Sequence, residues 1–219
     1  RPRLSIDGSP VDAFTGIGGF AETMLLHRRA VVKVESDIPL QLAALLGCAV
    51  LTGVGSVVNG ARVRPGETVA VIGIGGIGAS IVQGARIAGA SRIIAVDLHD
   101  TQLDLARRLG ATDTVKASES DAARTVLEMT AGGVDHAFEA VGLAPTINQA
   151  VRMVRPGRDA YMVGVPPVSQ PVPIPAGDMV LSGRGLRGLL MGSNHFPTDI
   201  PRMVDMYRQG RLHLDELVG

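Results

Sequence analysis

The sequence predicts an α/β fold, a doubly wound parallel sheet with helices on both faces, accompanied by part of a β-rich domain. Short runs of β-branched residues alternate with segments of helical periodicity, a pattern typical of βαβ crossovers. The first of these runs ends in a cluster of glycines that leads directly into a helical segment. Because 46% of the 219 residues are hydrophobic but only 3% are aromatic, the core is expected to be aliphatic.

The first half of the α/β region contains two strands and two helices. Residues 68–72 form a nearly continuous β-branched run of the kind that is buried on both faces of a sheet. Apolar residues recur at helical spacing over residues 76–89. A second apolar run covers residues 92–97, and a second helix is expected over residues 100–109, ending at Gly110.

The second half continues the alternation. Ser118 and Asp121 resemble a capping box that begins a third helix, and glycines at 132 and 133 end it. The elements expected after it are a strand at 134–140, a helix at 145–153 and a strand at 160–165. Five prolines between residues 166 and 175 then predict an irregular connection rather than a central strand.

The two ends of the chain differ from this middle part. Residues 1–40 contain a glycine cluster at 16–19 and short alternating segments such as 21–25, which predict β structure with turns. Residues 198–209 have the apolar face of a helix, which ends at Gly210. We therefore expect three regions, residues 1–49, 50–190 and 191–219, of which the middle one holds the parallel sheet.

Charge and cysteine content argue against several functional classes. The 21 basic and 21 acidic residues give a formal net charge of zero, which argues against a nucleic-acid partner and a polybasic membrane surface. No apolar run approaches the roughly 18 residues of a membrane-spanning helix. The single cysteine, Cys48, cannot form an intramolecular disulfide and favours a reducing, cytoplasmic location.

A glycine-rich turn carries the strongest functional signal. Gly73, Gly75 and Gly78 form a G-x-G-x-x-G pattern between the strand at 68–72 and the helix at 76–89. In this context the first glycine permits a tight turn, the second lets a pyrophosphate approach, and the third allows close helix–strand packing. The phosphates would lie at the positive end of the helix. The pattern predicts a dinucleotide-binding Rossmann fold; the alternative interpretation is a plain glycine turn.

Asp97 is the second part of this pattern, because it ends the next strand, 19 residues after Gly78. A carboxylate at this position accepts hydrogen bonds from the ribose hydroxyls of adenosine and repels a 2′-phosphate. His99 and Gln102 nearby provide no obvious cationic clamp for such a phosphate. Asp97 therefore favours NAD over NADP; the alternative is an ordinary acidic residue at a strand end.

Cys48 lies in an apolar stretch and, taken alone, is typical of a small buried hydrophobic residue. Its neighbourhood changes this interpretation, because several motifs follow it in a fixed order: Gly47-Cys48, Thr52-Gly53, Arg64-Pro65-Gly66, residues 71–78, residues 94–97, residues 133–142 and residues 163–166. Together they resemble the zinc-dependent medium-chain alcohol dehydrogenases over essentially the whole chain. Within that family the sequence is most similar to the long-chain group that includes glutathione-dependent formaldehyde dehydrogenase and its bacterial relatives.

The resemblance implies roles for individual residues. Cys48 would be a ligand of the catalytic zinc, and Thr52 would act beside the nicotinamide ring of NAD. Asp97 would bind the adenosine ribose, and Met191 would contact the carboxamide through its backbone. The other NAD contacts that it implies are Gly73, Ile74, Gly75, Gly76, Ile77, Gly78, Val141, Val163, Gly164 and Val165.

The resemblance also implies how the chain is divided and how it associates. Residues 1–49 would be the end of a GroES-like catalytic domain, 50–190 the NAD-binding domain, and 191–219 the start of the return to the catalytic domain. Residues 183–191 would be the edge strand through which subunits form a dimer or tetramer.

Some parts of the family pattern have no counterpart in the sequence, namely the other two ligands of the catalytic zinc, the proton relay and the structural zinc lobe. The five histidines are scattered, with no pair at ligand spacing. We therefore expect the chain alone to be inactive, and the complete protein to use zinc and NAD on an alcohol or aldehyde. Two alternatives stay open: a non-catalytic dinucleotide-binding module, and a zinc-free reductase like the quinone oxidoreductases, against which Cys48 argues.

Overall fold

The computed structural model describes residues 4–11, 19, 21–35 and 37–218 of the chain. The chain divides into two compact units, residues 1–33 and 34–219. In the first unit, β1 (Leu4–Ile6) pairs antiparallel with β2 (Ser9–Val11), and η2 (Arg28–Ala30) forms one helical turn. The prediction of a strand at 21–25 is wrong: residues 21–23 form a bend, and 24–25 have no regular structure. An alternating pattern becomes a strand only where a partner takes up its hydrogen bonds. Residues 16–18 of the glycine cluster lie outside the described residues.

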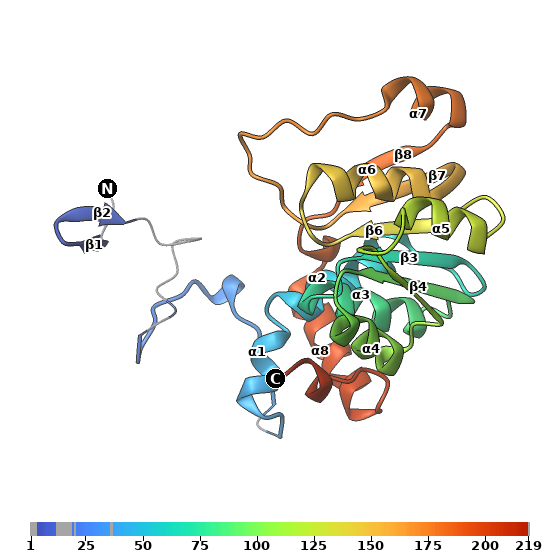
Figure 1. Cartoon of the computed structure of the whole chain (residues 1–219). Coiled ribbons are helices and arrows are strands. Elements are labelled where there is room, and N and C mark those ends of the chain that lie inside the picture. The colour runs from blue at the N-terminus through green and yellow to red at the C-terminus, as the bar shows by residue number, and fades with distance from the viewer. Residues whose placement is uncertain (1–3, 12–18, 20, 36, 219) are drawn as a thin grey trace. The chain divides into compact units, whose positions relative to one another are not determined.

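The second unit is built around a six-stranded parallel sheet (Figure 1). Its strands follow the order β5-β4-β3-β6-β7-β8, so the chain moves outward from β3 in one direction and then in the other. This doubly wound order confirms the predicted Rossmann fold and sets its switch point at the carboxyl ends of β3 and β6, where sheets of this kind have a ligand-binding crevice. The strands are β3 (Thr68–Ile72), β4 (Arg92–Asp97), β5 (Asp113–Lys116), β6 (Val134–Glu139), β7 (Val154–Met162) and β8 (Gly185–Gly188).

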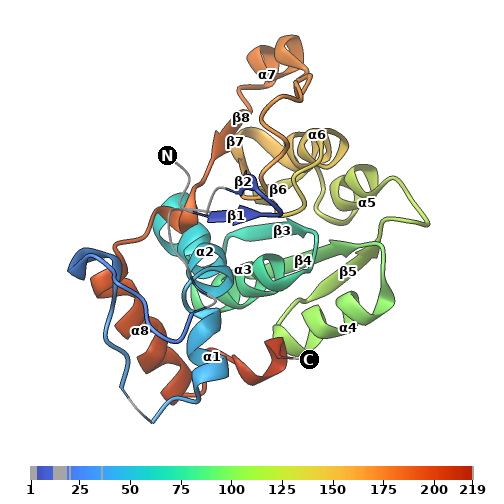
Figure 2. The same cartoon turned by 90° about the vertical axis from the view of Figure 1, so that its left-hand side faces the viewer.

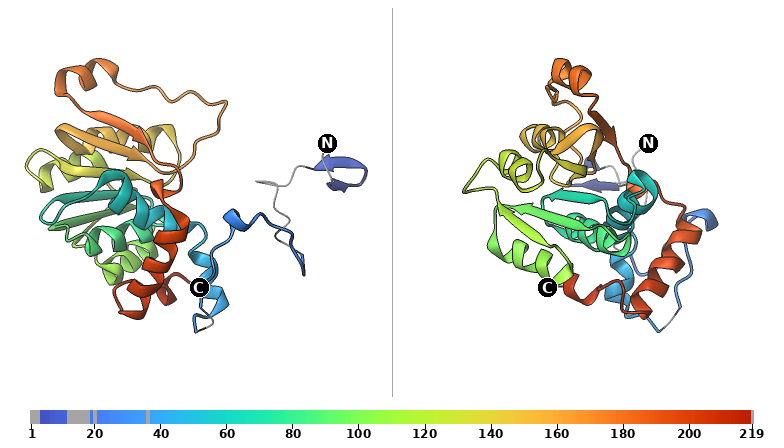
Figure 3. Two further views of the ribbon diagram at one scale, coloured as in Figure 1. Left: turned by 180° about the vertical axis from the view of Figure 1, so that it is seen from behind. Right: turned by 90° about the vertical axis from the view of Figure 1, so that its right-hand side faces the viewer.

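Helices cover both faces of the sheet (Figures 2 and 3). Successive strand residues point to opposite faces, so Val69 and Val71 share one apolar cluster while Ala70 and Ile72 belong to another. The first cluster includes side chains of α3 (Gly76–Ile87) and α4 (Asp100–Leu109). The second includes side chains of α5 (Ala122–Met129) and α6 (Ala144–Met153). The core is aliphatic, as composition predicts.

A third apolar cluster lies beside the sheet and joins segments from both ends of the second unit. It contains Leu42 and Leu51 from the early helices and Met203 from α8. None of the helices in the described part of the chain combines the length and apolar character that a membrane crossing requires. The remaining elements are α1 (Leu40–Leu45), α2 (Ala49–Gly55), η3 (Ser56–Ala61), α7 (Ala176–Ser182), η4 (Met191–Ser193), α8 (Phe196–Arg208) and η5 (Asp215–Leu217).

Most expected elements are confirmed, and three differences have physical reasons. Helix α5 is capped by Asp121, which accepts from the N–H groups of residues 123 and 124, whereas Ser118 precedes the helix and does not cap it. Strand β5 is not predicted from the sequence, because it is short and largely polar. Strand β7 covers residues 154–162 instead of the expected 160–165. It starts early because Val154 already pairs with Val134 of β6, ahead of a register shift in which Gly157 takes a φ of +75°.

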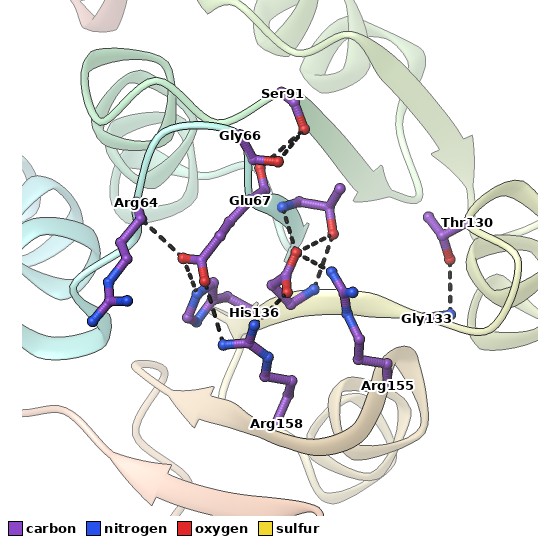
Figure 4. Close-up of polar contacts among 11 residues, drawn as sticks. Arg64, Gly66, Glu67, Ser91, Thr130, Gly133, His136, Arg155 and Arg158 are labelled. Carbon is purple, nitrogen blue, oxygen red and sulfur yellow. Dashed lines mark hydrogen bonds and ion pairs between the residues drawn. The ribbon is translucent and has the colours of Figure 1, made fainter.

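A network of polar and charged side chains lies at the end of the sheet where β3 and β6 begin, on the side away from the crevice (Figure 4). Glu67 pairs with His136 at 2.8 Å and with Arg158 at 3.3 Å. The side chain of Asp135 is 3% exposed; it accepts hydrogen bonds from the backbone and hydroxyl of Thr68 and pairs with Arg155 and Arg158. The network joins the starts of β3 and β6 to β7 and lies away from the crevice.

Candidate cofactor-binding site

The turn between β3 and α3 can be built only with glycine at two positions. Gly73 has a φ of +86°, and its N–H donates to the carbonyl of Val96 at 2.9 Å. A Cβ atom at Gly73 would lie 2.4 Å from Val141 Cγ2. A Cβ atom at Gly78 would lie 1.8 Å from the carbonyl oxygen of Gly73, so the first turn of α3 packs directly on the chain that enters it.

Gly75 differs from its two neighbours, because no protein atom requires it to be glycine. It precedes α3 with extended backbone angles, and a Cβ atom there would meet nothing within 4 Å. The first N–H groups of a helix have no partner within the helix and form a natural anion site. The missing side chain therefore leaves space directly in front of these groups, where a pyrophosphate would need it.

Asp97 connects the end of β4 to the glycine turn. One carboxylate oxygen accepts from the N–H of Ile74 at 2.7 Å, and the other accepts from the N–H of His99 at 3.0 Å. A carboxylate offers about four acceptor positions, so two hydrogen bonds leave capacity for further donors. Asp97 therefore lies beside the glycine turn, and its carboxylate is at the carboxyl end of β4, next to the crevice.

The loop after β6 contacts Gly73 through Val141, and the loop after β7 packs against the loop after β6. A Cβ atom at Gly164 would lie 2.3 Å from the N of Gly142, and one at Gly142 would lie 2.9 Å from Val165. These loops hold Val141, which is half exposed, Val163, which is buried, and Val165, which is exposed. The predicted contact residues after β6 and β7 therefore lie together beside the turn.

Glu139 organises the first of these loops, a role that the sequence analysis did not assign. Its side chain is fully buried, and one carboxylate oxygen accepts from the N–H groups of Val141 and Gly142 at 2.9 and 2.7 Å. The same oxygen accepts from the hydroxyl of Thr146 at 2.7 Å. The only signal in the sequence is an acidic residue at the end of a buried strand.

Thr52 and Met191 are distant in sequence but adjacent in the structure. The Thr52 side chain is buried in α2, and its hydroxyl donates to the sulfur of Met191 at 3.7 Å. The side-chain nitrogen of Asn194 donates to the carbonyls of Leu51 and Met191 at 2.7 and 2.5 Å. A Cβ atom at Gly53 would lie 2.4 Å from Ser80 Cβ, so α2 also packs closely on α3. Both predicted nicotinamide-side residues therefore belong to one contact between α2 and η4.

Cys48 is exposed and immediately precedes α2, which contradicts the interpretation as a buried hydrophobic residue. No group of three or more histidine, cysteine, aspartate or glutamate side chains in the described ranges is placed to hold a metal ion. A catalytic zinc site needs three protein ligands and an open position. Cys48 could supply one of them, so the described residues by themselves do not fit a catalytic zinc.

Comparison with known proteins places this architecture in a family. Residues 76–208 match the model of the zinc-binding dehydrogenases. The chain is 36% identical to alcohol dehydrogenase 1 of Pisum sativum and of Trifolium repens; each match covers 100% of this chain and 58% of the relative.

Solved structures agree with the sequence relatives. Benzyl alcohol dehydrogenase from Acinetobacter calcoaceticus has a TM-score of 0.90 at 33% identity, covering 94% of this chain and 57% of that one. An alcohol dehydrogenase zinc-binding domain protein from Burkholderia ambifaria has a TM-score of 0.90 at 37% identity, covering 97% and 58%. The chain thus spans less than two thirds of these relatives. It belongs to the zinc-binding dehydrogenases of the medium-chain alcohol dehydrogenase type.

Proposed function

We propose that the chain is the NAD-binding part of a zinc- and NAD-dependent alcohol dehydrogenase. The observation that supports this most directly is the open space at Gly75, in front of the α3 N-terminus and beside the Asp97 carboxylate. A turn that only had to connect β3 to α3 would need glycine at 73 and 78 but not at 75. Since the chain covers 58% of its curated relatives, turnover is proposed for a longer protein.

In this proposal each predicted residue contributes to one bound dinucleotide. Residues 73–78 receive the pyrophosphate, and Asp97 accepts from the hydroxyls of the adenosine ribose. Val141, Val163, Gly164 and Val165 line the groove from the β6 and β7 loops. Residues 50–190 form the NAD-binding domain, between catalytic-domain regions at 1–49 and 191–219.

The chemistry that we propose is hydride exchange between an alcohol or aldehyde and the nicotinamide, which NAD supplies when bound. The contribution of the chain is to fix the ring position, because alignment of the reacting atoms lowers the barrier to transfer. Thr52 and Met191, held together by Asn194, offer a preorganised contact for the ring. Cys48 would hold zinc together with further ligands that lie outside the described residues.

The sheet offers one route to the proposed dimer or tetramer. Strand β8 lies at the end of the sheet, and the expected edge at 183–191 contains it. Exposed apolar side chains accompany it, among them Leu181 and Leu190, which are 91% and 81% exposed. Pairing of β8 with a second copy would cover this edge. A reducing, cytoplasmic setting is proposed from the free thiol of Cys48.

The first test is a calorimetric titration of this chain with NADH and then with NADPH, with zinc assayed in the same sample. We expect NADH to bind at least about tenfold more tightly than NADPH, because Asp97 faces the 2′ position with a like charge. We expect little bound zinc, since a single candidate ligand is present among the described residues. A folded chain, verified by a cooperative thermal melt, that binds neither nucleotide would contradict the proposed site.

The second test concerns Cys48 in a longer protein that also has counterparts of the relatives' regions that this chain does not cover. Cys48→Ala is expected to remove the catalytic-site zinc and reduce turnover by at least about 10³-fold, because the metal loses one of three protein ligands. Metal content and turnover are measured together, and NADH affinity should stay unchanged. A variant that keeps both zinc and activity would refute the ligand role, and an intact protein without turnover would favour the non-catalytic module.

A further inference from the structure

A cationic side chain lies beside Asp97 that sequence spacing does not reveal. Strands β4 and β5 pair in parallel, with Asp97 directly opposite Lys116 at their carboxyl ends. Val96 and Val115, which precede them, belong to one apolar cluster beneath α5 and α6. Because strand side chains alternate between faces, Asp97 and Lys116 share the other face, which α3 and α4 cover. The Cα atom of Lys116 therefore lies beside that of Asp97, whose carboxylate is proposed to bind the ribose.

Two carboxylates neutralise Lys116 in this arrangement. Its ammonium lies 2.7 Å from Asp100 Oδ2 and 3.0 Å from Glu119 Oε1. These hydrogen bonds raise the pKa of Lys116 above its usual value, so the ammonium stays charged at neutral pH. The Lys116 side chain is 29% exposed, whereas those of Asp100 and Glu119 are 70% and 67% exposed. Ion pairs with such exposed partners are weak, so Lys116 can turn to a stronger anion at little cost.

The net charge around Asp97 and Lys116 repels a 2′-phosphate more strongly than Asp97 would alone. Asp97, Asp100 and Glu119 contribute three negative charges and Lys116 one positive charge, which leaves two net negative charges. A phosphate monoester carries nearly two negative charges at neutral pH. A 2′-phosphate placed here would be repelled by the whole cluster, even though a lysine lies within it.

We propose that Lys116 is a specificity-determining residue for the cofactor, and that the negative charges of Asp97, Asp100 and Glu119 keep a 2′-phosphate from reaching it. The inference rests on the proposed function, because it takes the Asp97 corner as the adenosine-ribose end of the groove. When Asp97 and Asp100 lose their charges, the ammonium on its flexible four-carbon stem becomes the partner of the 2′-phosphate of NADP. Substitution of Asp97 alone removes one repulsive charge and leaves Lys116 engaged.

The test measures NADH and NADPH affinities of the full 219-residue chain by calorimetry. Four proteins are compared: the unaltered chain, Asp97→Ser, Asp97→Ser with Asp100→Asn, and the latter with Lys116→Met. We expect each of the first two changes to raise NADPH affinity about tenfold. Asp97→Ser removes one repulsive charge, and Asp100→Asn lets Lys116 form a charged hydrogen bond with the 2′-phosphate. Lys116→Met should cancel the gain from Asp100→Asn and leave NADH affinity within about twofold.

A matched control removes a positive charge elsewhere. The control is Arg211→Met in the Asp97→Ser, Asp100→Asn background. The Arg211 carbonyl accepts a hydrogen bond from Arg86 in the last turn of α3, so this residue lies away from the crevice. This control should leave NADPH affinity unchanged, and Lys116→Arg should preserve the gain. Equal NADPH affinity with and without Lys116 overturns this inference alone, provided that the unaltered chain binds NADH. A folded unaltered chain that binds no NADH overturns both the inference and the proposed function.

Discussion

Alanine at position 78 is expected to lower the free energy of unfolding by about 3 kcal/mol, the upper range for overpacking. The added methyl carbon would lie 1.8 Å from the carbonyl oxygen of Gly73 and 2.9 Å from its carbonyl carbon. Backbone atoms cannot turn aside as a flexible side chain does, so the first turn of α3 must move away from β3. Urea and thermal unfolding measure the effect, and a loss of this size lowers Tm by about 10 °C in a chain of this length.

Gly75→Ala is the matched variant, because the same methyl group at position 75 meets no protein atom within 4 Å. Its unfolding free energy should change by no more than about 1 kcal/mol, the cost of alanine at a helix N-cap. NADH affinity should nevertheless fall at least about tenfold, since the methyl group occupies the space proposed for the pyrophosphate. Unimpaired NADH binding by Gly75→Ala, or normal stability of Gly78→Ala, would contradict the geometry of the turn.

Asp135→Ala is expected to be the second most damaging change, at about 3 kcal/mol, because it leaves partners of a buried carboxylate unsatisfied. The carboxylate accepts from the backbone N–H and the hydroxyl of Thr68, both at 2.9 Å. Its partners Arg155 and Arg158 are 44% and 42% exposed, so water recovers part of their loss. Chemical unfolding measures the difference from the unaltered chain.

The control for this change is Asp104→Ala, which removes an exposed carboxylate from an i,i+3 pair with Arg107. It should alter the unfolding free energy by less than about 1 kcal/mol, as is usual for surface pairs. If both variants lose the same stability, the buried position of Asp135 contributes nothing and the explanation of the network is wrong.

The same network predicts how stability depends on pH. Burial alone would raise the pKa of Asp135, but hydrogen bonds from Thr68 and the charges of Arg155 and Arg158 outweigh it and lower the pKa. The pKa of Glu67 is also lowered: burial raises it, but hydrogen bonds from the Arg64 backbone and from His136 outweigh that effect. A depressed folded pKa stabilises the protein above the unfolded value of about 4 and loses that effect as pH falls through the folded pKa. Tm should therefore drop below about pH 4, and less steeply in Asp135→Ala.

The sequence determined those parts of the molecule that depend on neighbouring residues. The bounds expected for β3, β4 and α4 agree with the structure, because β-branched runs and apolar spacing with a glycine stop act within a single element. The glycine turn and Asp97 were found in the same way, since their spacing along one βαβ unit fixes how strand, turn and helix meet.

The tertiary structure alone decided what depends on pairing between distant segments. Strand β5 owes its conformation to pairing with β4, because a short polar segment would not form a strand alone. The start of β7 depends on the pairing of Val154 with Val134 of β6, ahead of a register shift. Thr52 contacts Met191, and Lys116 lies opposite Asp97 on the neighbouring strand, although no local sequence pattern connects the members of either pair. Sequence encodes such contacts only through the packing of the whole sheet, because the register of neighbouring strands sets which side chains become adjacent.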